Sequence, residues 1–412
     1  MKRFLIFIFI LLIGFIILFF AKGEQAKEKQ MIQNTTEVTS VKEKNETEET
    51  KIYAVWLTYS EIGNLVKGKN EEEYRESLET VFGNLSENKI NTVFYQCRAF
   101  CDSFYNSDIF PASKYITANT QIPTYDPFEI FLQMAGEYGI SVHCWINPYR
   151  ITYNSNFKDL PKNAPARALY NEDKTTLIIC EDGIFLNPAH SESRRLVLSG
   201  IREILEKYQV AGIHFDDYFY PESRNMNDKA LYKEYEEKGG ALSLNEWRRE
   251  NVNVLISSVY SLVKATDTNF IFSISPSADI EKCKNIFYCD VEKWCKEEGF
   301  VDFLIPQIYY GFENEKMPFT KVAQKWEELS QQGNVKLVCG LGAYKCGKPD
   351  SFAGTGQNEW KENVNILSQQ YEQMGKSSVW QGFALFSYSY CFGENVNYIS
   401  KKEIKNLLYM VE

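Results

Sequence analysis

Short apolar segments and amphipathic segments alternate eight times along most of this 412-residue chain. Apolar runs of roughly four to eight residues are typical of buried strands, and strands that alternate with helices predict a parallel sheet. The eight expected strands are Tyr53–Leu57, Thr92–Cys97, Ser141–Asn147, Gly212–Asp216, Phe270–Ser275, Asp302–Tyr309, Lys336–Gly342 and Gly382–Ser387.

Helical periodicity fills the stretches between the expected strands. The expected helices are Glu71–Asn88, Pro127–Tyr138, Ser191–Tyr208, Asn245–Lys264, Asp290–Glu298, Thr320–Gln332, Glu359–Met374 and Lys401–Met410. The first has an apolar face made of Tyr74, Leu78, Val81, Phe82 and Leu85. Eight strand–helix units favour an α/β fold of the (β/α)8 TIM-barrel type. A doubly wound open sheet is the rival, but the chain lacks a G-x-G-x-x-G turn.

Two long segments, residues 148–190 and 221–244, interrupt the alternation. They follow the third and fourth expected strands. Because loops that leave the strands of a barrel cover its catalytic face, we expect both insertions to lie over the mouth and to shape a substrate groove.

The beginning of the chain predicts export. Met1-Lys2-Arg3 precedes Phe4–Ala21, an unbroken apolar run that suits a membrane-spanning helix and is long for the core of a signal peptide. A weak cleavage site at Ala21-Lys22-Gly23 leaves both an uncleaved anchor and a secreted form open. We expect a signal anchor or signal peptide over residues 1–21, a disordered tether over 22–51 and an extracytoplasmic barrel over 52–412.

Charge and ligand-type residues exclude several classes of function. The net charge of −10 argues against nucleic-acid binding. Ten cysteines form no C-x-x-C pair, and the three histidines form no H-E-x-x-H motif. We therefore expect no metal site and no cofactor.

The active site of a (β/α)8 barrel lies at the carboxyl ends of its strands, so its residues can be named from the sequence. Aromatic rings, amides and arginines dominate these positions, which favours a carbohydrate ligand. The strand-end residues are Thr58, Tyr59, Gln96, Arg98, Asp102, Tyr105, His143, Trp145, Asn147, Tyr149, Arg150, His214, Asp216, Asp217, Tyr218, Ser275, Gln307, Tyr309, Tyr310, Tyr344, Lys345, Phe386, Ser387 and Tyr388.

The fourth expected strand ends in two adjacent carboxylates, Asp216 and Asp217. Successive side chains of a strand point to opposite faces, so at least one of the two lies on the turn that leaves the strand. The alternative is a structural one, in which an aspartate caps the next helix or holds a loop.

Eight segments in a fixed order resemble one known family. They are Ala54–Leu57, Asn91–Arg98, His143–Arg150, Gly212–Pro221, Trp247–Asn253, Ile274–Pro276, Val301–Tyr309 and Gly340–Tyr344. On these segments, residues 53–391 resemble the family-10-like glycosyl hydrolase domain, a bacterial cell-envelope group with a (β/α)8 barrel. The resemblance implies a glycosidase that acts on glycan strands, peptidoglycan among them.

Glycoside hydrolysis needs a proton donor and a second group that meets the cationic sugar carbon. The glutamates that many such barrels carry after strands 4 and 7 are missing here. The Asp216–Asp217 pair looks instead like the dyad of substrate-assisted hexosaminidases, in which the 2-acetamido group attacks the anomeric carbon. We expect Asp217 to be the acid/base and Asp216 to orient the acetamido group, with swapped roles still open. Asp102 is the reserve second carboxylate of a conventional mechanism, and its structural alternative is a salt bridge to Arg98.

The expected substrate-binding residues are Arg98, Trp145, Asn147, Arg150, His214, Tyr218, Gln307, Tyr309, Tyr344 and Tyr388. Arg98 and Arg150 are suited to the lactyl carboxylate of muramic acid. His214 has a buried structural role as its alternative, and Arg98 an ion pair inside the barrel.

The expected partners are a polysaccharide substrate and, through residues 1–21, a membrane, with no nucleic acid. Two further functions remain open. One is a non-catalytic barrel that binds cell-wall glycan, and the other is a conventional two-carboxylate hydrolase of another polysaccharide.

Overall fold

The computed structural model of the protein describes residues 51–117, 121–223, 226–394 and 396–411. The expected membrane segment, Phe4–Ala21, lies outside these residues, as does the expected tether apart from Lys51. Within the described part of the chain, no helix combines the length and the apolar character that a bilayer span requires.

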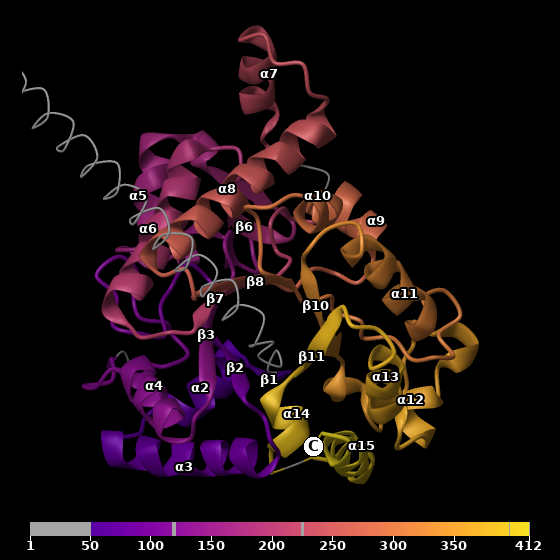
Figure 1. Ribbon diagram of the computed structural model, residues 1–412. Helices are drawn as coiled ribbons and strands as arrows, with labels where there is room; N and C mark the ends of the chain where they lie inside the picture. Colours follow the sequence, from indigo (N-terminus) through magenta and orange to yellow (C-terminus); the bar gives the residue numbers. More distant parts are fainter. Residues whose placement is uncertain (1–50, 118–120, 224–225, 395, 412) are drawn as a thin grey trace, which may run out of the picture. The chain divides into compact units, whose positions relative to one another are not determined.

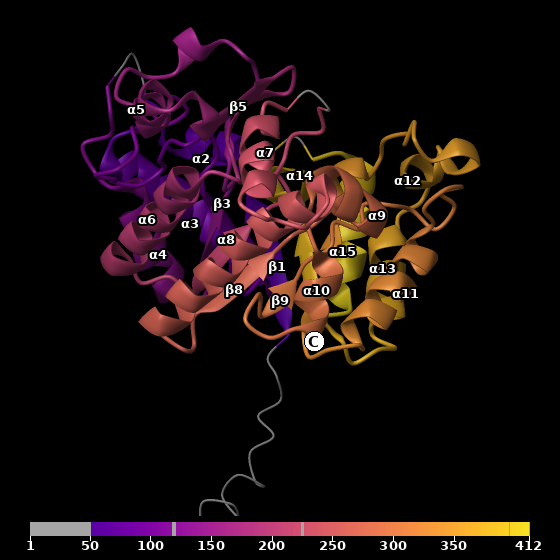
Figure 2. The same ribbon diagram turned by 90° about the horizontal axis from the view of Figure 1, so that it is seen from above.

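Eight parallel strands close into a barrel, which confirms the predicted (β/α)8 fold (Figures 1 and 2). Each strand pairs with the next one in the chain, and the last pairs with the first. The barrel strands are β1 (Ile52–Leu57), β2 (Thr92–Arg98), β3 (Ser141–Ile146), β7 (Gly212–Phe215), β8 (Ile271–Ile274), β9 (Phe303–Leu304), β10 (Lys336–Leu341) and β11 (Trp380–Leu385).

One strand is much shorter than predicted. Regular pairing covers only two residues of β9, whereas the sequence predicts a strand over Asp302–Tyr309. Pro306 has no backbone N–H to donate to the ladder, and it interrupts the strand. Beyond it, Gln307 returns to the sheet through isolated bridges to Ser277 and Gly340, so the barrel stays closed at the catalytic end.

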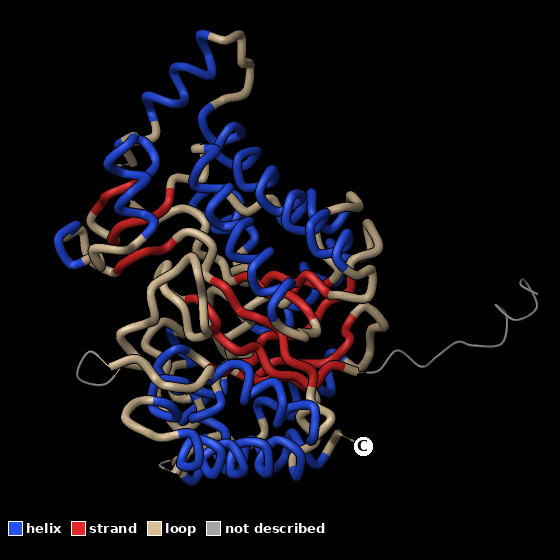
Figure 3. The backbone as a smooth tube through the Cα atoms, turned by 90° about the vertical axis from the view of Figure 1, so that its left-hand side faces the viewer, coloured by secondary structure: helices blue, strands red, loops and turns tan. Residues whose placement is uncertain are grey.

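Helices surround the barrel, as Figure 3 shows for the blue segments around the red strands. The principal ones are α2 (Tyr59–Val66), α3 (Glu71–Glu87), α4 (Pro127–Glu137), α6 (Ser191–Lys207), α8 (Leu244–Thr266), α10 (Val291–Lys296), α11 (Phe319–Ser330), α13 (Ile366–Met374) and α15 (Tyr398–Tyr409). Shorter elements are α9 (Ile280–Lys282), α12 (Glu359–Glu362), α14 (Tyr388–Phe392), η1 (Phe157–Asp159), η2 (Lys174–Thr176), η3 (Cys283–Phe287), η4 (Ala343–Lys345) and η5 (Gly354–Gly356).

Helix α3 shows why these segments fold as helices. The Asn70 side chain accepts a hydrogen bond from the backbone N–H of Glu73, and the Glu73 carboxylate accepts one from the backbone N–H of Asn70, which together form a capping box. The five apolar residues of the predicted face are all buried against the barrel.

The segment Glu359–Met374, predicted as one helix, is instead two helices, α12 and α13. The chain leaves the helical conformation at Asn363, where ψ is 159°. The buried carboxylate of Glu403 accepts the backbone N–H groups of Ile366 and Leu367 at 2.9 and 3.0 Å, and it caps the start of α13 from the last helix. A distant side chain therefore sets this boundary.

Both predicted insertions are present. Residues 148–190 hold α5 (Pro165–Glu172) and an antiparallel sheet of order β4–β6–β5, seen as a separate red sheet in Figure 3. Its strands are β4 (Arg150–Thr152), β5 (Leu177–Cys180) and β6 (Gly183–Leu186). The second insertion holds α7 (Lys229–Glu237), which projects away from the barrel in Figure 1.

The inside of the barrel is a separate apolar cluster, distinct from the larger core between strands and helices. It consists of Ala54, Trp56, Phe94, Trp145, Ile305, Val338 and Ala384. Three of these residues, Trp56, Phe94 and Trp145, carry large aromatic rings, so the inside of the barrel is a packed core rather than a pore.

Candidate active site

A cavity of about 140 Å³ lies at the carboxyl ends of the barrel strands. Strand ends contribute most of its wall, and the first insertion contributes the rest. The lining residues are Trp56, Thr58, Tyr59, Gln96, Trp145, Arg150, Tyr153, Asp216, Asp217, Tyr218, Ser275, Gln307, Tyr309 and Phe386.

Aromatic carbon surfaces line much of the cavity. The Phe386 ring lies 5.9 Å from Trp56, 6.5 Å from Trp145 and 5.9 Å from Tyr309, measured between ring centroids. Both indole N–H groups are already used, because Trp56 donates to His214 and Trp145 donates to Asp216. These rings therefore offer a ligand an apolar surface.

His214 lies inside the barrel and is completely buried. Its Nε2 accepts the indole N–H of Trp56 at 3.2 Å, so the proton is on Nδ1, which donates to the hydroxyl of Ser273 at 2.9 Å. Burial holds the pKa of His214 well below its usual value, so the ring is neutral. With both nitrogens engaged, His214 positions Trp56 and offers a ligand no polar atom.

Asp216 follows the last residue of β7, and its side chain is only 3% exposed. Its Oδ2 accepts the indole N–H of Trp145 at 3.0 Å, and its Oδ1 accepts the backbone N–H of Tyr218 at 3.4 Å. Burial raises the pKa of Asp216 to about 7, although the charge of Arg150 acts in the opposite direction; the neighbouring charge of Asp217 raises it further.

Asp217 lies one residue further along the turn and is half-buried. Burial raises the pKa of its carboxyl to about 6, and a hydrogen bond from the Gln307 side chain partly offsets that rise. The Gln307 amide is itself held by the Ser275 carbonyl, which accepts from Nε2 at 2.8 Å. Near neutral pH the two carboxyls can therefore hold one proton between them, as an acid/base pair requires.

Arg150 forms the wall beside the carboxyls. Its guanidinium lies over the rings of Tyr218, Tyr153 and Phe100 at 4.1, 4.4 and 5.1 Å. Its backbone N–H donates to Oδ1 of Asn147 at 2.9 Å, which fixes the turn between β3 and β4. The first insertion thus places a cation in the cavity.

Seven of the predicted site residues line this cavity: Trp145, Arg150, Asp216, Asp217, Tyr218, Gln307 and Tyr309. Tyr344 lies directly behind the wall, with its ring edge-to-face on Tyr309 at 5.6 Å. Asn147 is buried below Arg150.

The structure leaves four other predicted residues outside the cavity. Besides His214, Arg98 is buried under Phe110 with a ring distance of 4.7 Å. The hydroxyl of Tyr388 accepts from Asn84 of α3, on the outer side of the barrel. Asp102 accepts the backbone N–H of Phe100 at 3.0 Å, and among the described residues it forms no salt bridge with Arg98. The geometry gives no support to a substrate contact by these side chains.

Two lining residues, Trp56 and Tyr153, had no signal in the sequence as site residues. Trp56 lies within β1 rather than after it, and only the closed barrel shows that its ring reaches the cavity. Tyr153 lies in the first insertion, where strand ends give no guide. Thr58, Tyr59, Gln96, Ser275 and Phe386 were strand-end residues without an assigned role.

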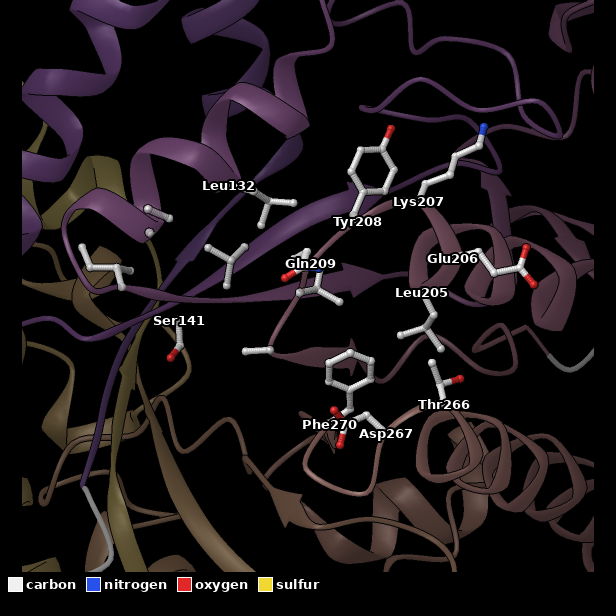
Figure 4. Close-up of a pocket in the computed structure, with 16 residues that line it drawn as sticks. Leu132, Ser141, Leu205, Glu206, Lys207, Tyr208, Gln209, Thr266, Asp267 and Phe270 are labelled. Carbon is white, nitrogen blue, oxygen red and sulfur yellow. The ribbon is translucent and has the colours of Figure 1, made fainter.

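A second, larger cavity of about 520 Å³ lies at the amino ends of β3, β7 and β8 (Figure 4). Ser141 and Phe270 mark these strand starts on its wall. The charged ends of Glu206 and Lys207 point away from the middle of this cavity in Figure 4. Among the described residues, no group of three or more His, Cys, Asp or Glu side chains is arranged to hold a metal ion.

Curated relatives share about two thirds of the chain. Glycosyl hydrolase DigH of Escherichia coli (strain K12) is 29% identical over 301 residues, covering 67% of this chain and 66% of DigH. Glycosyl hydrolase YngK of Bacillus subtilis (strain 168) is 28% identical over 299 residues, covering 68% of this chain and 58% of YngK. The chain thus spans less than two thirds of the length of either relative.

Solved glycoside hydrolase structures share the fold. The PgaB (BpsB) glycoside hydrolase domain from Bordetella bronchiseptica matches with a TM-score of 0.58 and 12% identity, over 87% of this chain and 98% of that one. The catalytic domain of β-amylase from Paenibacillus polymyxa matches with a TM-score of 0.56 and 9% identity, over 88% and 99%. At such identities the likeness shows the barrel fold alone.

The family assignment rests on the sequence match. The model of the family described as glycosyl hydrolase-like 10 matches residues 51–360, which is most of the chain and all the barrel strands except β11. This glycoside hydrolase-like barrel therefore belongs to the glycosyl hydrolase-like 10 family.

Proposed function

We propose that this protein is a glycoside hydrolase that cleaves glycan strands containing N-acetylhexosamine, with Asp216 and Asp217 as its catalytic pair. The observation that carries the proposal is the pair itself: two adjacent carboxyls with raised pKa values beside an aromatic cavity surface. A binding module has no need of two desolvated carboxyls, because each is costly to keep without a counter-charge.

The cavity surface favours an acetamido sugar. Trp56, Trp145 and Phe386 offer carbon surface for a methyl group, since both indole N–H groups are engaged. Asp216 lies against the same rings and is suited to accept an amide N–H. The hydroxyl of Tyr309, which forms no hydrogen bond among the described residues, is available to donate to the amide carbonyl.

The proposed reaction uses the substrate's own amide as the nucleophile. The acetamido oxygen forms a bond to the anomeric carbon while the bond from that carbon to the leaving oxygen breaks. Asp217, on the open side of the cavity, gives its proton to the leaving oxygen. Water then attacks the anomeric carbon and gives a proton to Asp217, while the bond from that carbon to the acetamido oxygen breaks and the acetamido group is restored. Two displacements at the same carbon leave the product with the original anomeric configuration.

Binding of the substrate determines which of the two carboxyls carries the shared proton. In the empty site the pKa values of both carboxyls are raised, so either residue can carry the shared proton. An amide N–H that donates to Asp216 stabilises its charged form and lowers its pKa. The proton then moves to Asp217, where the leaving oxygen needs it.

Peptidoglycan is the proposed polymer, because both of its sugars carry acetamido groups and the start of the chain predicts an exported protein. The relatives named glycosyl hydrolase support the reaction class. We place the protein outside the cytoplasm, anchored by residues 1–21 or released after cleavage.

The first experiment incubates the purified protein and its Asp217→Asn variant with peptide-free peptidoglycan strands and reads the products by mass spectrometry. We expect shortened strands from the wild type alone. Products from both proteins would move the acid role to Asp216. Strands that bind but stay intact with the wild type would indicate a glycan-binding barrel instead.

An acetamide-mimicking thiazoline inhibitor tests the role of the substrate amide. A substrate-assisted site binds such a compound far more tightly than it binds substrate, because the compound resembles the transition state. An activity that the compound leaves uninhibited would exclude the dyad mechanism and favour a conventional pair of carboxylates.

A further inference from the structure

Arg150 is a buried cation that forms no salt bridge with an acidic side chain among the described residues. It is only 4% exposed, although it lines the cavity. Among the described residues, no Asp or Glu forms a salt bridge with it, and its buried Nε has no hydrogen-bond partner. A desolvated guanidinium normally requires an anion or several acceptors. Arg150 has a side-chain hydrogen bond with Tyr218, but its Nε lacks an acceptor in the free cavity.

The two other buried arginines among the described residues differ: both terminal nitrogens of Arg98 lack a hydrogen-bond partner, whereas all three guanidinium nitrogens of Arg248 are paired. Arg248 donates from Nε and NH2 to the two carboxylate oxygens of Asp228, both at 2.7 Å, and from NH1 to the hydroxyl of Tyr288 at 2.7 Å. This is the bidentate arrangement in which arginine binds carboxylates most strongly. Arg150 has the same side chain and a similar degree of burial, but no carboxylate among the described residues forms a salt bridge with it, and Asp216 and Asp217 act on it only as nearby charges.

The position of Arg150 is fixed before any ligand arrives. It is the first residue of β4 and pairs with Phe185 of β6. The rings of Tyr218, Tyr153 and Phe100 contact its guanidinium, which restricts the rotation of the long side chain. A preorganised cation loses little conformational entropy when an anion binds.

The neighbours of Arg150 indicate which position of a bound sugar its guanidinium faces. Tyr218 links the two groups: its backbone N–H donates to Asp216 at 3.4 Å, and its ring lies 4.1 Å from the Arg150 guanidinium. In the proposed function Asp216 accepts the amide N–H at position 2 of the sugar. A substituent at position 3, the adjacent ring carbon, then extends toward Arg150.

We propose that Arg150 binds a carboxylate carried on position 3 of the sugar whose glycosidic bond is cleaved. This inference rests on the proposed function, because it uses Asp216 to orient the sugar. In peptidoglycan only muramic acid carries such a group, as its lactyl ether. Hydrolysis therefore adds the hydroxyl of water to muramic acid and a proton to the oxygen of the neighbouring sugar, so muramic acid becomes the new reducing end.

The test combines a change in the protein with a change in the substrate. Wild type, Arg150→Gln and Arg150→Lys are assayed on peptide-free strands and on the same strands with their lactyl carboxylates converted to methyl esters. Arg195→Gln is the matched control, because it removes the same charge from an exposed helix position. New ends are identified by borohydride reduction and mass spectrometry.

We expect Arg150→Gln to lower kcat/KM on the acid strands by about 10-fold to 100-fold, the usual effect of losing a hydrogen bond to a charged group. Esterification of the lactyl carboxylates lowers the wild-type kcat/KM by a similar factor. The two losses do not multiply: Arg150→Gln acting on esterified strands should lose no more than either change causes alone. Arg150→Lys recovers part of the loss. New ends that carry reduced muramic acid support the inference.

Two results would overturn the inference and leave the proposed function intact: losses that multiply, or new ends that carry reduced N-acetylglucosamine. If the wild type cleaves neither the acid strands nor the esterified strands, the proposed function fails. The carboxylate site at Arg150 is then tested separately, by measuring binding. In NMR titrations the wild type should then still bind N-acetylmuramic acid better than N-acetylglucosamine, and Arg150→Gln should not. An equal preference in both proteins would reject the carboxylate site.

Discussion

The two ends of the barrel differ in the volume of their cavities and in the environment of the charged side chains there. The cavity at the amino ends of the strands measures about 520 Å³, and the one at the carboxyl ends about 140 Å³. Yet the charges near the larger cavity are exposed or paired: Lys207 lies 2.7 Å from Asp108 and 3.3 Å from Glu203, and Glu206 faces solvent. Groups that remain in water or in pairs keep ordinary reactivity.

The smaller cavity holds its charged groups out of water and only partly compensated. Asp216, Asp217 and Arg150 come together there within a wall of aromatic rings. Desolvation strengthens every electrostatic interaction in such a place and shifts proton affinities toward neutral pH. Desolvated charge rather than cavity volume is therefore the reason to propose the active site at the carboxyl end of this barrel.

The largest effect that we expect at the carboxyl end comes from Asp217. Asp217→Asn should lower kcat on glycan strands about 10³-fold, because the leaving oxygen loses its proton donor. A dinitrophenyl N-acetylmuraminide should be spared much of this loss, since its leaving group departs without a proton. Steady-state kinetics on both substrates makes the measurement, and a loss limited to the strands identifies the acid. The same selective loss in Asp216→Asn would show that the roles are exchanged.

The pH dependence of kcat/KM tests the two carboxyls of the smaller cavity and should give the next largest effect. With pKa values of about 6 and about 7 for the two carboxyls, the pair is fully protonated at low pH and fully ionised at high pH. Activity requires one proton on the pair, so we expect a bell-shaped profile with its maximum near pH 6.5 and a fall of about tenfold per unit on each outer side. A flat profile from pH 5 to pH 8 would contradict this assignment.

A smaller effect should follow from Trp145→Phe, which removes the indole N–H that donates to Asp216 at 3.0 Å. The charged form of Asp216 loses a hydrogen bond, so its pKa rises and its ionised fraction at neutral pH falls. We expect kcat/KM to fall about tenfold and the optimum to move to higher pH. A lower activity with an unmoved optimum would mean that Trp145 acts only as a sugar-stacking ring.

The smallest effects belong to the amino end. Glu206→Gln and Gln209→Ala change side chains on the wall of the larger cavity (Figure 4). Both residues are exposed, so kcat/KM should stay within about twofold of wild type and thermal stability within the range of surface substitutions. A tenfold loss of activity from either variant would break the comparison and assign a function to the larger cavity.

Much of the fold could be predicted because barrel strands and their helices differ in period. The carboxyl-terminal rule then predicted Asp216, Asp217 and Gln307 as site residues, and the structure places all three on the wall of the cavity at that end. The true length of β9 could not be predicted, because the chain beyond Pro306 returns to the sheet through isolated bridges to neighbouring segments. The start of α13 depends on Glu403, a residue of another helix.

Side-chain direction limited the prediction of the site. Arg98 follows a register shift between Gln96 and Arg98 in the pairing of β2 with β3, which changes the direction expected from simple alternation. Tyr388 begins a helix and turns toward Asn84 rather than toward the cavity. Tyr153 belongs to an insertion whose path no local pattern in the sequence describes.

The inserted sheet has a consequence for how such enzymes diversify. Strands β4, β5 and β6 pair only with one another, and they hold Arg150 and Tyr153 against the cavity from outside the barrel ladder. The carboxyl pair, in contrast, depends on β7 and its barrel neighbours. Under the proposed function, reaction chemistry and ligand preference are thus encoded in separable stretches of the chain. Exchange of residues 148–190 between family members should therefore transplant a preference for one sugar while the catalytic step stays the same.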